Sequence, residues 1–379
     1  MRNVDAAGLG IGDDYPPRIM GVLNVSEESP YSPSVFDDPG EAAEYVDEDL
    51  IGEGADIVDV GLESANKRFE VLTAAEELDR LDTAVEAIHS VSGDAVFSIE
   101  TRYHEVAEAA LDAGFDMVND ICGFADPEMP RVCAERDVAV AKMASPPDLE
   151  RPGAVEDVDD IYEALKREGL TDKTIVDPAF GGWSEAKTLE DDRETFRRLR
   201  EFRALGQPIL VSINRKNFLR DLAGRSTEAA LPVSLAATAM AVERGAHVVR
   251  THDVAETRDA ALIGKAFTRS RLRQSGDVTV EELDVTNAGE MRRHLDRVGG
   301  EASAARRGVV RVFELSGLSP RERETLADAV RSTPVVVAGE GDHRLLAGTP
   351  ADLSAVVESA SGRSDALDAA LSAVAEGAE

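Results

Sequence analysis

The chain is 379 residues long, enough for two domains, and its 74 acidic residues outnumber the 41 basic ones to give a net charge of −33. Nucleic acid and anionic membranes are therefore poor partners, because both carry charge of the same sign. The sequence also lacks an apolar run of about 18 residues, the length a transmembrane helix needs, and its first residues have no signal-peptide core.

The pattern that organises the first part of the chain is clearest at residues 18–29. Residues 19–23 are all apolar or glycine, and the run ends abruptly at Asn24. A short apolar run of this kind is typical of a strand buried on both faces, here with an amide at its C-terminal end. Seven further runs end in polar residues in the same way, at 57–61, 95–100, 117–120, 138–143, 174–177, 209–213 and 247–251.

The spacing of these eight runs leaves room for one helix and two loops between successive strands. This rhythm predicts a (β/α)8 TIM barrel over residues 18–271, whose active site would lie at the C-terminal strand ends. A doubly wound sheet is the alternative, but no Gly-x-Gly-x-x-Gly turn follows the first run to support it.

The segments between the runs complete the predicted barrel. Residues 1–17 lack periodicity and are expected to form a leader loop, whereas apolar spacing predicts helices over 40–51, near 106–113 and over 255–267. Residues 26–36 are rich in Ser and Pro, the composition of a mobile active-site loop.

The remaining residues, 276–379, predict a smaller C-terminal α/β domain. Its predicted elements are alternation over 278–285, helices over 291–298 and 320–330, a strand over 309–315, a hairpin of 335–338 and 343–346, and an Ala-rich helical tail. This domain contains no catalytic motif, so its role is left open, and His343 beside the hairpin turn is interpreted as structural.

The polar residues at the strand ends form a candidate site, made of Glu100, Asp177, Asn24, Asn119, Lys216, Arg250 and His252. A buried carboxylate can accept two parallel N–H bonds from the amidine edge of a 2-amino-4-oxo pyrimidine, and Lys216 can donate to the carbonyl and ring nitrogen of the same molecule. Arg250, His252 and Asn24 have the chemistry to hold a phosphate group and its divalent cation. The sequence has no His-Glu-x-x-His motif, no Walker loop and no His near Ser26 or Ser29, which argues against covalent catalysis and a zinc hydrolase.

A series of motifs in this region resembles, in order, the signatures of the dihydropteroate synthase family of pterin-binding barrels. They stand at residues 20–25, 54–61, 63–64, 98–101, 119–121, 177–178, 215–216 and 250–254. The resemblance implies a transferase of folate biosynthesis, which joins 6-hydroxymethyl-7,8-dihydropterin diphosphate to p-aminobenzoate and releases pyrophosphate. It also allows a homodimer, because the family is often dimeric.

The same resemblance implies a role for each strand-end residue. The pterin ring would be bound by Glu100, Asn119, Asp177 and Lys216, with Met143 against its face. The pyrophosphate would be held by Asn24, Arg250 and His252, with Asn24 as the ligand of Mg²⁺. The residues with catalytic roles would be Asp177, Lys216, Arg250 and His252, since they bind the ring and stabilise the leaving charge.

The sequence departs from the family pattern mainly in the loops for the second substrate. The family usually has Asp where Glu100 stands, and residues 26–30, 64–67 and 214–217 also differ from its motifs. The candidate residues for binding p-aminobenzoate, or a related arylamine, are Ser64, Lys67, Arg68 and Asn217. The two cations among them either pair with the arylamine carboxylate or are solvated surface charges.

Two other functions remain open at this stage. A corrinoid-linked methyltransferase barrel would bind a methylated tetrahydropterin and need no grip on a diphosphate, so Arg250 and His252 argue against it. A non-catalytic pterin-binding homologue is consistent with the changed loops.

The composition also predicts the environment of the protein. Acidic residues are spread along the chain and only seven of the 41 basic residues are Lys, which resembles proteins of a salt-rich cytoplasm. There the Debye length falls to ~3 Å at 1 M salt and screens self-repulsion. An acidic mesophile protein is the alternative. Cys122 and Cys133 lie in or beside apolar patterns and are expected to be buried thiols of a cytoplasmic protein.

Overall fold

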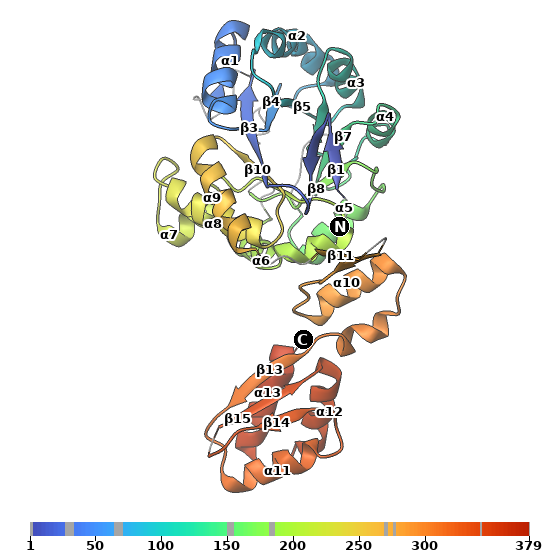
Figure 1. Cartoon of the computed structure of the whole chain (residues 1–379), viewed down its shortest axis with the longest axis vertical. Helices are drawn as coiled ribbons and strands as arrows, with labels where there is room; N and C mark the ends of the chain where they lie inside the picture. The colour runs from blue at the N-terminus through green and yellow to red at the C-terminus, as the bar shows by residue number, and fades with distance from the viewer. Residues whose placement is uncertain are drawn as a thin grey trace. The chain divides into compact units, whose positions relative to one another are not determined.

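The computed structural model describes residues 3–26, 34–63, 71–149, 155–181, 186–268, 272–275, 278–341 and 343–378. The chain divides into two compact units, Met1–Arg269 and Ser270–Glu379 (Figure 1). Within the described ranges, no helix is long and apolar enough to cross a membrane.

The first unit is built on eight strands, as the sequence predicts. They are β3 (Arg18–Asn24), β4 (Ile57–Gly61), β5 (Val96–Thr101), β6 (Met117–Asp120), β7 (Ala139–Met143), β8 (Thr174–Asp177), β9 (Leu210–Val211) and β10 (Val248–Thr251). Neighbouring strands pair in parallel in the order β8-β7-β6-β5-β4-β3-β10-β9. A parallel bridge between Val176 and Ile209 joins β8 to the start of β9, so the sheet closes into the predicted barrel.

Alternation along the strands decides what fills the barrel. Ile57, Met117 and Ile175 belong to an apolar cluster of fully buried residues. Because side chains alternate with a period of two, the residues two positions further along these strands, Asp59, Asn119 and Asp177, have the same orientation. The barrel therefore has an apolar base and a polar mouth.

A short hairpin near the N-terminus shows that the prediction of a leader loop was wrong. β1 (Val4–Ala6) and β2 (Leu9–Ile11) pair antiparallel, and their turn residues, Ala7 and Gly8, have φ of 50° and 91°. Two positive φ values in a row match the twist of the flanking strands. The buried side chains of the hairpin join the apolar cluster at the base of the barrel; they are Val4, Ala6 and Ile11. Strands of three residues are too short to produce a clear sequence pattern.

Helices surround the strands on the outside (Figure 1). They are α1 (Pro39–Tyr45), continued by the π-helix η2 (Val46–Ile51), α2 (Ala74–Ser90), α3 (His104–Asp112), α4 (Met129–Glu135), α5 (Val158–Lys166), α6 (Leu189–Arg197), the 3-10 helix η3 (Leu199–Leu205), α7 (Asn217–Ala223), α8 (Leu231–Glu243) and α9 (Val254–Phe267). The helices predicted over 40–51, near 106–113 and over 255–267 are confirmed. The two cysteines are free and buried, as predicted.

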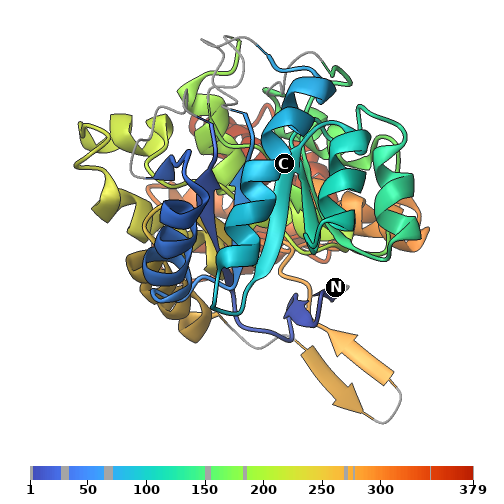
Figure 2. The same ribbon diagram turned by 90° about the horizontal axis from the view of Figure 1, so that it is seen from above.

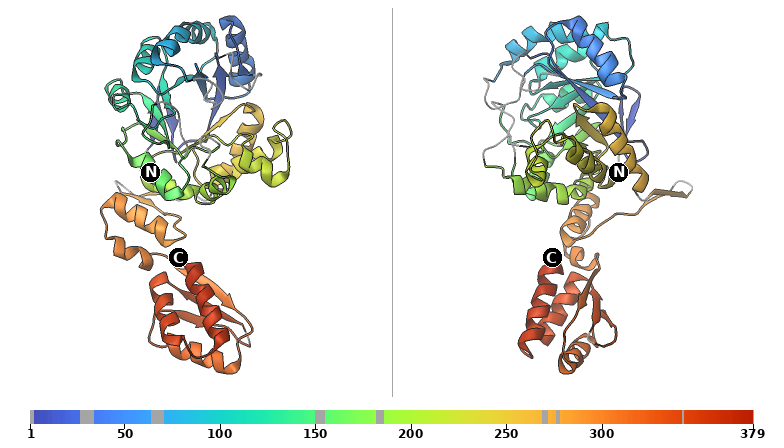
Figure 3. Two further views of the ribbon diagram at one scale, coloured as in Figure 1. Left: turned by 180° about the vertical axis from the view of Figure 1, so that it is seen from behind. Right: turned by 90° about the vertical axis from the view of Figure 1, so that its left-hand side faces the viewer.

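The second unit is an α/β structure with its own core. Its sheet has the order β13 (Arg311–Leu315), β15 (Arg344–Gly348), β14 (Val336–Ala338), with antiparallel pairing. Figure 3 shows helices α12 (Pro350–Ala360) and α13 (Asp365–Ala378) along one face of this sheet. The other elements are α10 (Ala288–Val298), η4 (Ala302–Arg307), α11 (Pro320–Val330) and a separate ribbon of β11 (Leu272–Ser275) and β12 (Val278–Glu281), seen in Figure 2.

The predicted strand, helices and hairpin of this unit are therefore present. Leu346 and Leu371 are fully buried in its core, whereas Val312 and Val336 on the opposite sheet face are 63% and 59% exposed. His343 lies at the surface, where its Nδ1 pairs with Glu314 at 2.8 Å.

Candidate active site

The ends of the barrel strands bring the predicted pterin and phosphate residues to one region. Parallel pairing sets Glu100 of β5 beside Asn119 of β6, and Met143 of β7 beside Asp177 of β8. Asn24 ends β3 and lies across from Gly61 of β4. A polar ring at the mouth, as the sequence predicts, follows from this register.

Asp59, a residue that the prediction of the site missed, is the centre of this ring. Its side chain has no exposed surface. One carboxylate oxygen, Oδ1, accepts a hydrogen bond from Ser98 Oγ at 2.8 Å, and the other, Oδ2, accepts from Asn119 Nδ2 at 2.9 Å and Arg250 Nε at 2.7 Å. Asp59 thus positions a residue predicted for the pterin and a residue predicted for the pyrophosphate. The signal that could have found it is its place two residues before the strand end, on the inward face of β4.

Arg250 lies between two carboxylates. Its Nη2 donates to Glu100 Oε2 at 2.6 Å, while its Nε is held by Asp59. Burial opposes the charge of the guanidinium, but Glu100 and Asp59 outweigh it and raise the pKa of Arg250. For Glu100, burial raises the pKa to about 7, and the charges of Asp59 and Glu63 act in the same direction against Arg250. The Glu100 carboxylate is therefore costly to keep ionised where it lies.

Asp177 and Lys216 form the opposite side of the mouth. Burial raises the pKa of Asp177 to about 6, although the Ala179 N–H at 2.8 Å and the charge of Lys216 stabilise the ionised form. Burial and the charge of Arg250 lower the pKa of Lys216. Gly181 makes room for this lysine, since a Cβ there would lie 3.0 Å from Nζ, and its φ of +119° also favours glycine. Clustered groups with shifted pKa values are typical of functional sites.

The turn after β8 is held by a buried lysine that the prediction also missed. Lys187 Nζ donates to the Ala179 carbonyl at 2.9 Å and pairs with Asp192 at 3.2 Å. Asp192 in turn accepts from the Gly181 N–H at 3.2 Å. This arrangement supports the backbone that approaches Lys216.

Asn24 ends β3, and His252 follows directly after β10. Asn24 Nδ2 donates to Ser34 Oγ at 3.0 Å, and its Oδ1 lies near Gly61, where a Cβ would be 3.2 Å away. The amide oxygen is thus directed toward the strand ends. Burial, followed by the charge of Arg250, lowers the pKa of His252 to about 3, so the ring is neutral at pH 7. Met143 is 4% exposed at the end of β7.

Comparison with known proteins decides the family. A family model described as "Pterin binding enzyme" matches residues 20–252. The chain belongs to this family. A dihydropteroate synthase of Clostridium beijerinckii is 34% identical over 258 residues, which cover 66% of this chain and 94% of that protein.

Two further relatives extend the comparison. The probable bifunctional folylpolyglutamate synthase/dihydropteroate synthase of Haloferax volcanii is 36% identical over 279 residues, and the aligned part covers 69% of this chain. The chain spans only about a third of the length of that relative, 32%. The solved structure of a dihydropteroate synthase from Coxiella burnetii, in complex with pteroic acid, has a TM-score of 0.59 and 30% identity, and covers 71% of this chain and 99% of that one.

Of the four residues predicted for the second substrate, the structure describes one. Ser64, Lys67 and Arg68 lie outside the described residues. Asn217 is exposed at the first residue of α7, where its Oδ1 accepts from Arg220 Nη1 at 3.1 Å. Its role in binding an arylamine stays a prediction.

Arg215, next to Lys216, has a structural role in this pterin binding enzyme. Its guanidinium makes two hydrogen bonds of 2.8 Å to Asp253 and donates to the carbonyls of Thr227 and Glu228 at 2.8 and 2.9 Å. These contacts link Arg215, which precedes Lys216, to Asp253, which follows His252, and to the loop before α8.

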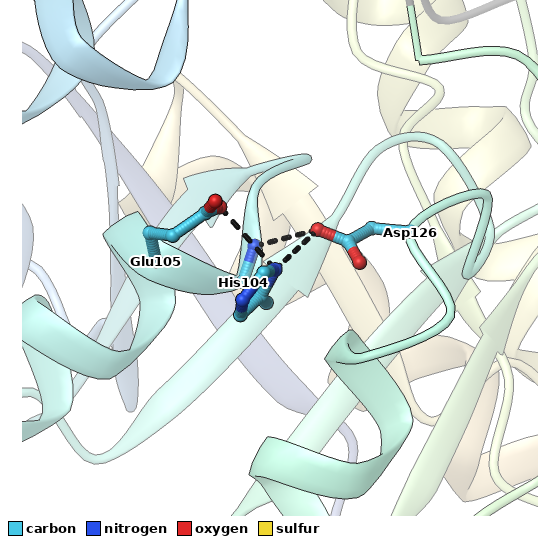
Figure 4. Close-up of side chains that lie close together, drawn as sticks. All are labelled: His104, Glu105 and Asp126. Carbon is cyan, nitrogen blue, oxygen red and sulfur yellow. Dashed lines mark hydrogen bonds and ion pairs between the residues drawn. The ribbon is translucent and has the colours of Figure 1, made fainter.

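A second polar cluster lies beside the loops that follow β5 and β6 (Figure 4). His104 Nδ1 is 2.8 Å from Asp126 Oδ2 and 3.2 Å from Glu105 Oε2. Asp126 also accepts a hydrogen bond from the backbone N–H of His104 at 3.0 Å. Burial disfavours the charged ring, but the two carboxylates outweigh it and raise the pKa of His104. Within the described part of the chain this is the only group of three metal-ligand side chains. Their mutual pairing accounts for their proximity, and we assign no metal there.

Proposed function

We propose that this chain is a dihydropteroate synthase, a transferase that joins 6-hydroxymethyl-7,8-dihydropterin diphosphate to p-aminobenzoate or a related arylamine and releases pyrophosphate. The observation that carries the proposal is the convergence of Asn119, Asp177, Lys216 and Arg250 at the mouth of the barrel. Support also comes from the relatives, because the Coxiella burnetii structure is in complex with pteroic acid, in which a pterin is already joined to p-aminobenzoate.

The pterin would bind through the neutral and charged groups around Asp177. A carboxylate can accept two parallel N–H bonds from the 2-amino pyrimidinone edge, Lys216 can donate to its carbonyl and ring nitrogen, and Asn119 can complete the edge. Asp177 is 6% exposed and costly to ionise, since burial raises its pKa. A ligand that donates two hydrogen bonds to it relieves this cost, which favours binding of the ring.

The diphosphate would bind to the groups around Arg250. Arg250 supplies a permanent positive charge, and neutral His252 supplies a hydrogen-bond donor without needing to gain a proton. The amide oxygen of Asn24 fits Mg²⁺, which binds through few protein oxygens together with phosphate oxygens and water. When bound, Mg²⁺ would neutralise part of the charge on the leaving group.

The reaction then needs positioning rather than a protein nucleophile. The amine nitrogen of the arylamine forms a bond to the methylene carbon of the pterin, the carbon–oxygen bond breaks so that its electron pair leaves with pyrophosphate, and the amine loses a proton to water or to the departing pyrophosphate. The electron-rich dihydropterin delocalises the positive charge that develops on the methylene carbon, while Arg250 stabilises the charge on the departing oxygen. Among the described mouth residues, none has to form a covalent intermediate.

The cell environment that we propose is a cytoplasm with high salt. The net charge of −33 and the scarcity of Lys support it, and one relative comes from Haloferax volcanii. Molar salt screens the acidic surface, so an anionic diphosphate can approach the barrel.

The test is pyrophosphate release by the purified chain in molar KCl with Mg²⁺. Release should require both the pterin diphosphate and p-aminobenzoate, and Asp177→Asn should abolish it. Glu105→Gln removes one exposed acidic group from the first turn of α3 and should leave pyrophosphate release unchanged. If the chain binds the pterin diphosphate but releases no pyrophosphate with p-aminobenzoate or with other arylamines, the proposal is contradicted. That result would indicate a non-catalytic homologue.

A further inference from the structure

We propose that the ion pair between Glu100 and Arg250 couples the binding of the pterin ring to the binding of the pyrophosphate. The pterin ring binds Glu100 and the pyrophosphate binds Arg250, so either half of the substrate breaks the ion pair when it binds. The other half then binds more tightly, because its partner is already released from the pair. The inference rests on the proposed function, because it assigns the ring to Glu100 and the pyrophosphate to Arg250.

Only one side of the Arg250 guanidinium takes part in this exchange. Nε is held at 2.7 Å by Asp59, a fully buried carboxylate that Ser98 and Asn119 also hold in place. Nη2 instead contacts Glu100 Oε2 at 2.6 Å, and Glu100 is 12% exposed at the strand end. The Asp59 contact therefore anchors Arg250, and the Glu100 contact is the one a ligand can replace.

The length of Glu100 makes this contact possible. The family motif usually has Asp at this position, and an Asp carboxylate would be set back by about 1.5 Å, one carbon–carbon bond. From 2.6 Å such a retreat gives a separation beyond the range of a hydrogen bond. The glutamate thus adds a contact to Arg250 that an aspartate at this position would not make.

Competition for the two partners produces the coupling. If the ring alone draws Glu100 away, Arg250 keeps Asp59 but loses its second carboxylate. If pyrophosphate alone draws Arg250 away, Glu100 stays beside Asp59 and Glu63, whose charges already oppose its ionisation. When both halves bind, each group has a new partner and neither cost remains. The coupling is positive and, by linkage, equal in both directions.

The same exchange acts after the reaction. Once pyrophosphate leaves, Arg250 can pair again with Glu100, which weakens the hold of Glu100 on the pterin of the product. The ion pair therefore favours release of the second product after the first.

The test is calorimetric titration of the full chain, in molar KCl with Mg²⁺, with 6-hydroxymethyl-7,8-dihydropterin lacking its diphosphate. Saturating pyrophosphate should tighten pterin binding about 5- to 150-fold in the wild type, the usual range of coupling between sites. In Glu100→Asp the factor should fall to about one or two, with pterin still bound. Glu105→Asp makes the same change on an exposed neighbouring carboxylate, 53% exposed, and should keep the wild-type factor.

Pyrophosphate alone provides a second, independent measurement. It should bind Glu100→Asp more tightly than the wild type, because Arg250 no longer has to leave Glu100. Glu100→Gln keeps the side-chain length but removes the charge, and it should also bind pyrophosphate more tightly. Equal coupling in the wild type and Glu100→Asp, or weaker pyrophosphate binding in both variants, would overturn the inference. If the wild type binds pterin but pyrophosphate does not change its affinity, this inference fails and the proposed function stands. If the wild type does not bind pterin even with pyrophosphate, the proposed function fails too.

Discussion

The base and the mouth of the barrel each hold carboxylates that are buried or partly buried among basic groups, but their pKa values shift in opposite directions. At the base, Asp13 accepts hydrogen bonds from Arg203 at 3.0 and 2.9 Å and from His247 Nε2 at 3.1 Å. Burial alone would raise the pKa of Asp13, but these bonds outweigh it and hold the pKa well below its usual range. At the mouth, burial raises the pKa of Glu100 to about 7 and of Asp177 to about 6.

The lowered pKa at the base reflects contacts that stabilise the fold, whereas the raised pKa values at the mouth favour binding of a ligand. The base satisfies its charges with protein groups, and His247 Nδ1 accepts from the Ile209 N–H at 3.0 Å, which leaves Nε2 as the donor to Asp13. At the mouth, the ionised forms of Glu100 and Asp177 stay costly although Arg250 and the Ala179 N–H already donate to them, and further donors from a ligand would lower this cost. In (β/α)8 barrels the N-terminal end generally serves stability and the C-terminal end function.

The largest expected effect is at the mouth. In Asp177→Asn, one acceptor of the paired interaction becomes a donor that opposes the N–H groups of the ring. We expect a loss of ~2–5 kcal/mol in binding of the pterin diphosphate, measured by calorimetry. The melting temperature should not fall, because the ionised carboxylate is disfavoured in the folded site. Unchanged affinity would contradict the assignment of the ring.

The next largest effect is expected at the base, where a substitution should lower stability rather than pterin affinity. Asp13→Asn removes the charge that pairs with Arg203 and turns one acceptor oxygen into a donor, and should lower the free energy of unfolding by ~1.5–3 kcal/mol in urea titrations. Pterin affinity should stay at the wild-type value. A large loss of affinity with full stability would show that the two ends are not separable in this way.

The pH dependence of stability should differ in sign between the two ends. The folded chain holds the Glu100 proton more tightly than the unfolded chain, whose pKa is near 4.5, so this group lowers stability as the pH rises from about 4.5 to 7. Asp13 has a lowered pKa, so its contribution is present above about pH 3.8 and is lost as the pH falls further. Each pKa unit corresponds to about 1.4 kcal/mol. Urea titrations of Glu100→Gln should show a flatter decline between pH 5 and 7; an identical slope would refute the shift.

The smallest effect is expected from removing the second unit. Truncation after Arg271 should leave a folded barrel, because the two units have separate cores. Binding of the pterin diphosphate should then change by less than threefold, since both ends compared above lie in the first unit. Loss of cooperative unfolding, or aggregation of the truncated chain in molar salt, would show that the barrel depends on its C-terminal unit.

Much of the barrel could be predicted from the sequence. Buried parallel strands give continuous apolar runs, and each run here ends at polar residues. The positions of the strands, and the order of Asn24, Glu100, Asn119 and Asp177 at their ends, can therefore be identified from short stretches of sequence. The hairpin at the base was missed because its strands are short. The second-substrate residues rest on resemblance, since loop positions carry no periodic signal.

The sequence by itself determined the eight strands, the end of the barrel that carries the polar residues and the family motifs, because these follow from short-range patterns and chain order. Only the tertiary structure decided which of these residues touch. Arg250 meets Asp59 and Glu100 across separations of 191 and 150 residues, which no local pattern encodes. Burial, and therefore the raised pKa values at the mouth and the lowered one at the base, arises only when the strands close around these groups.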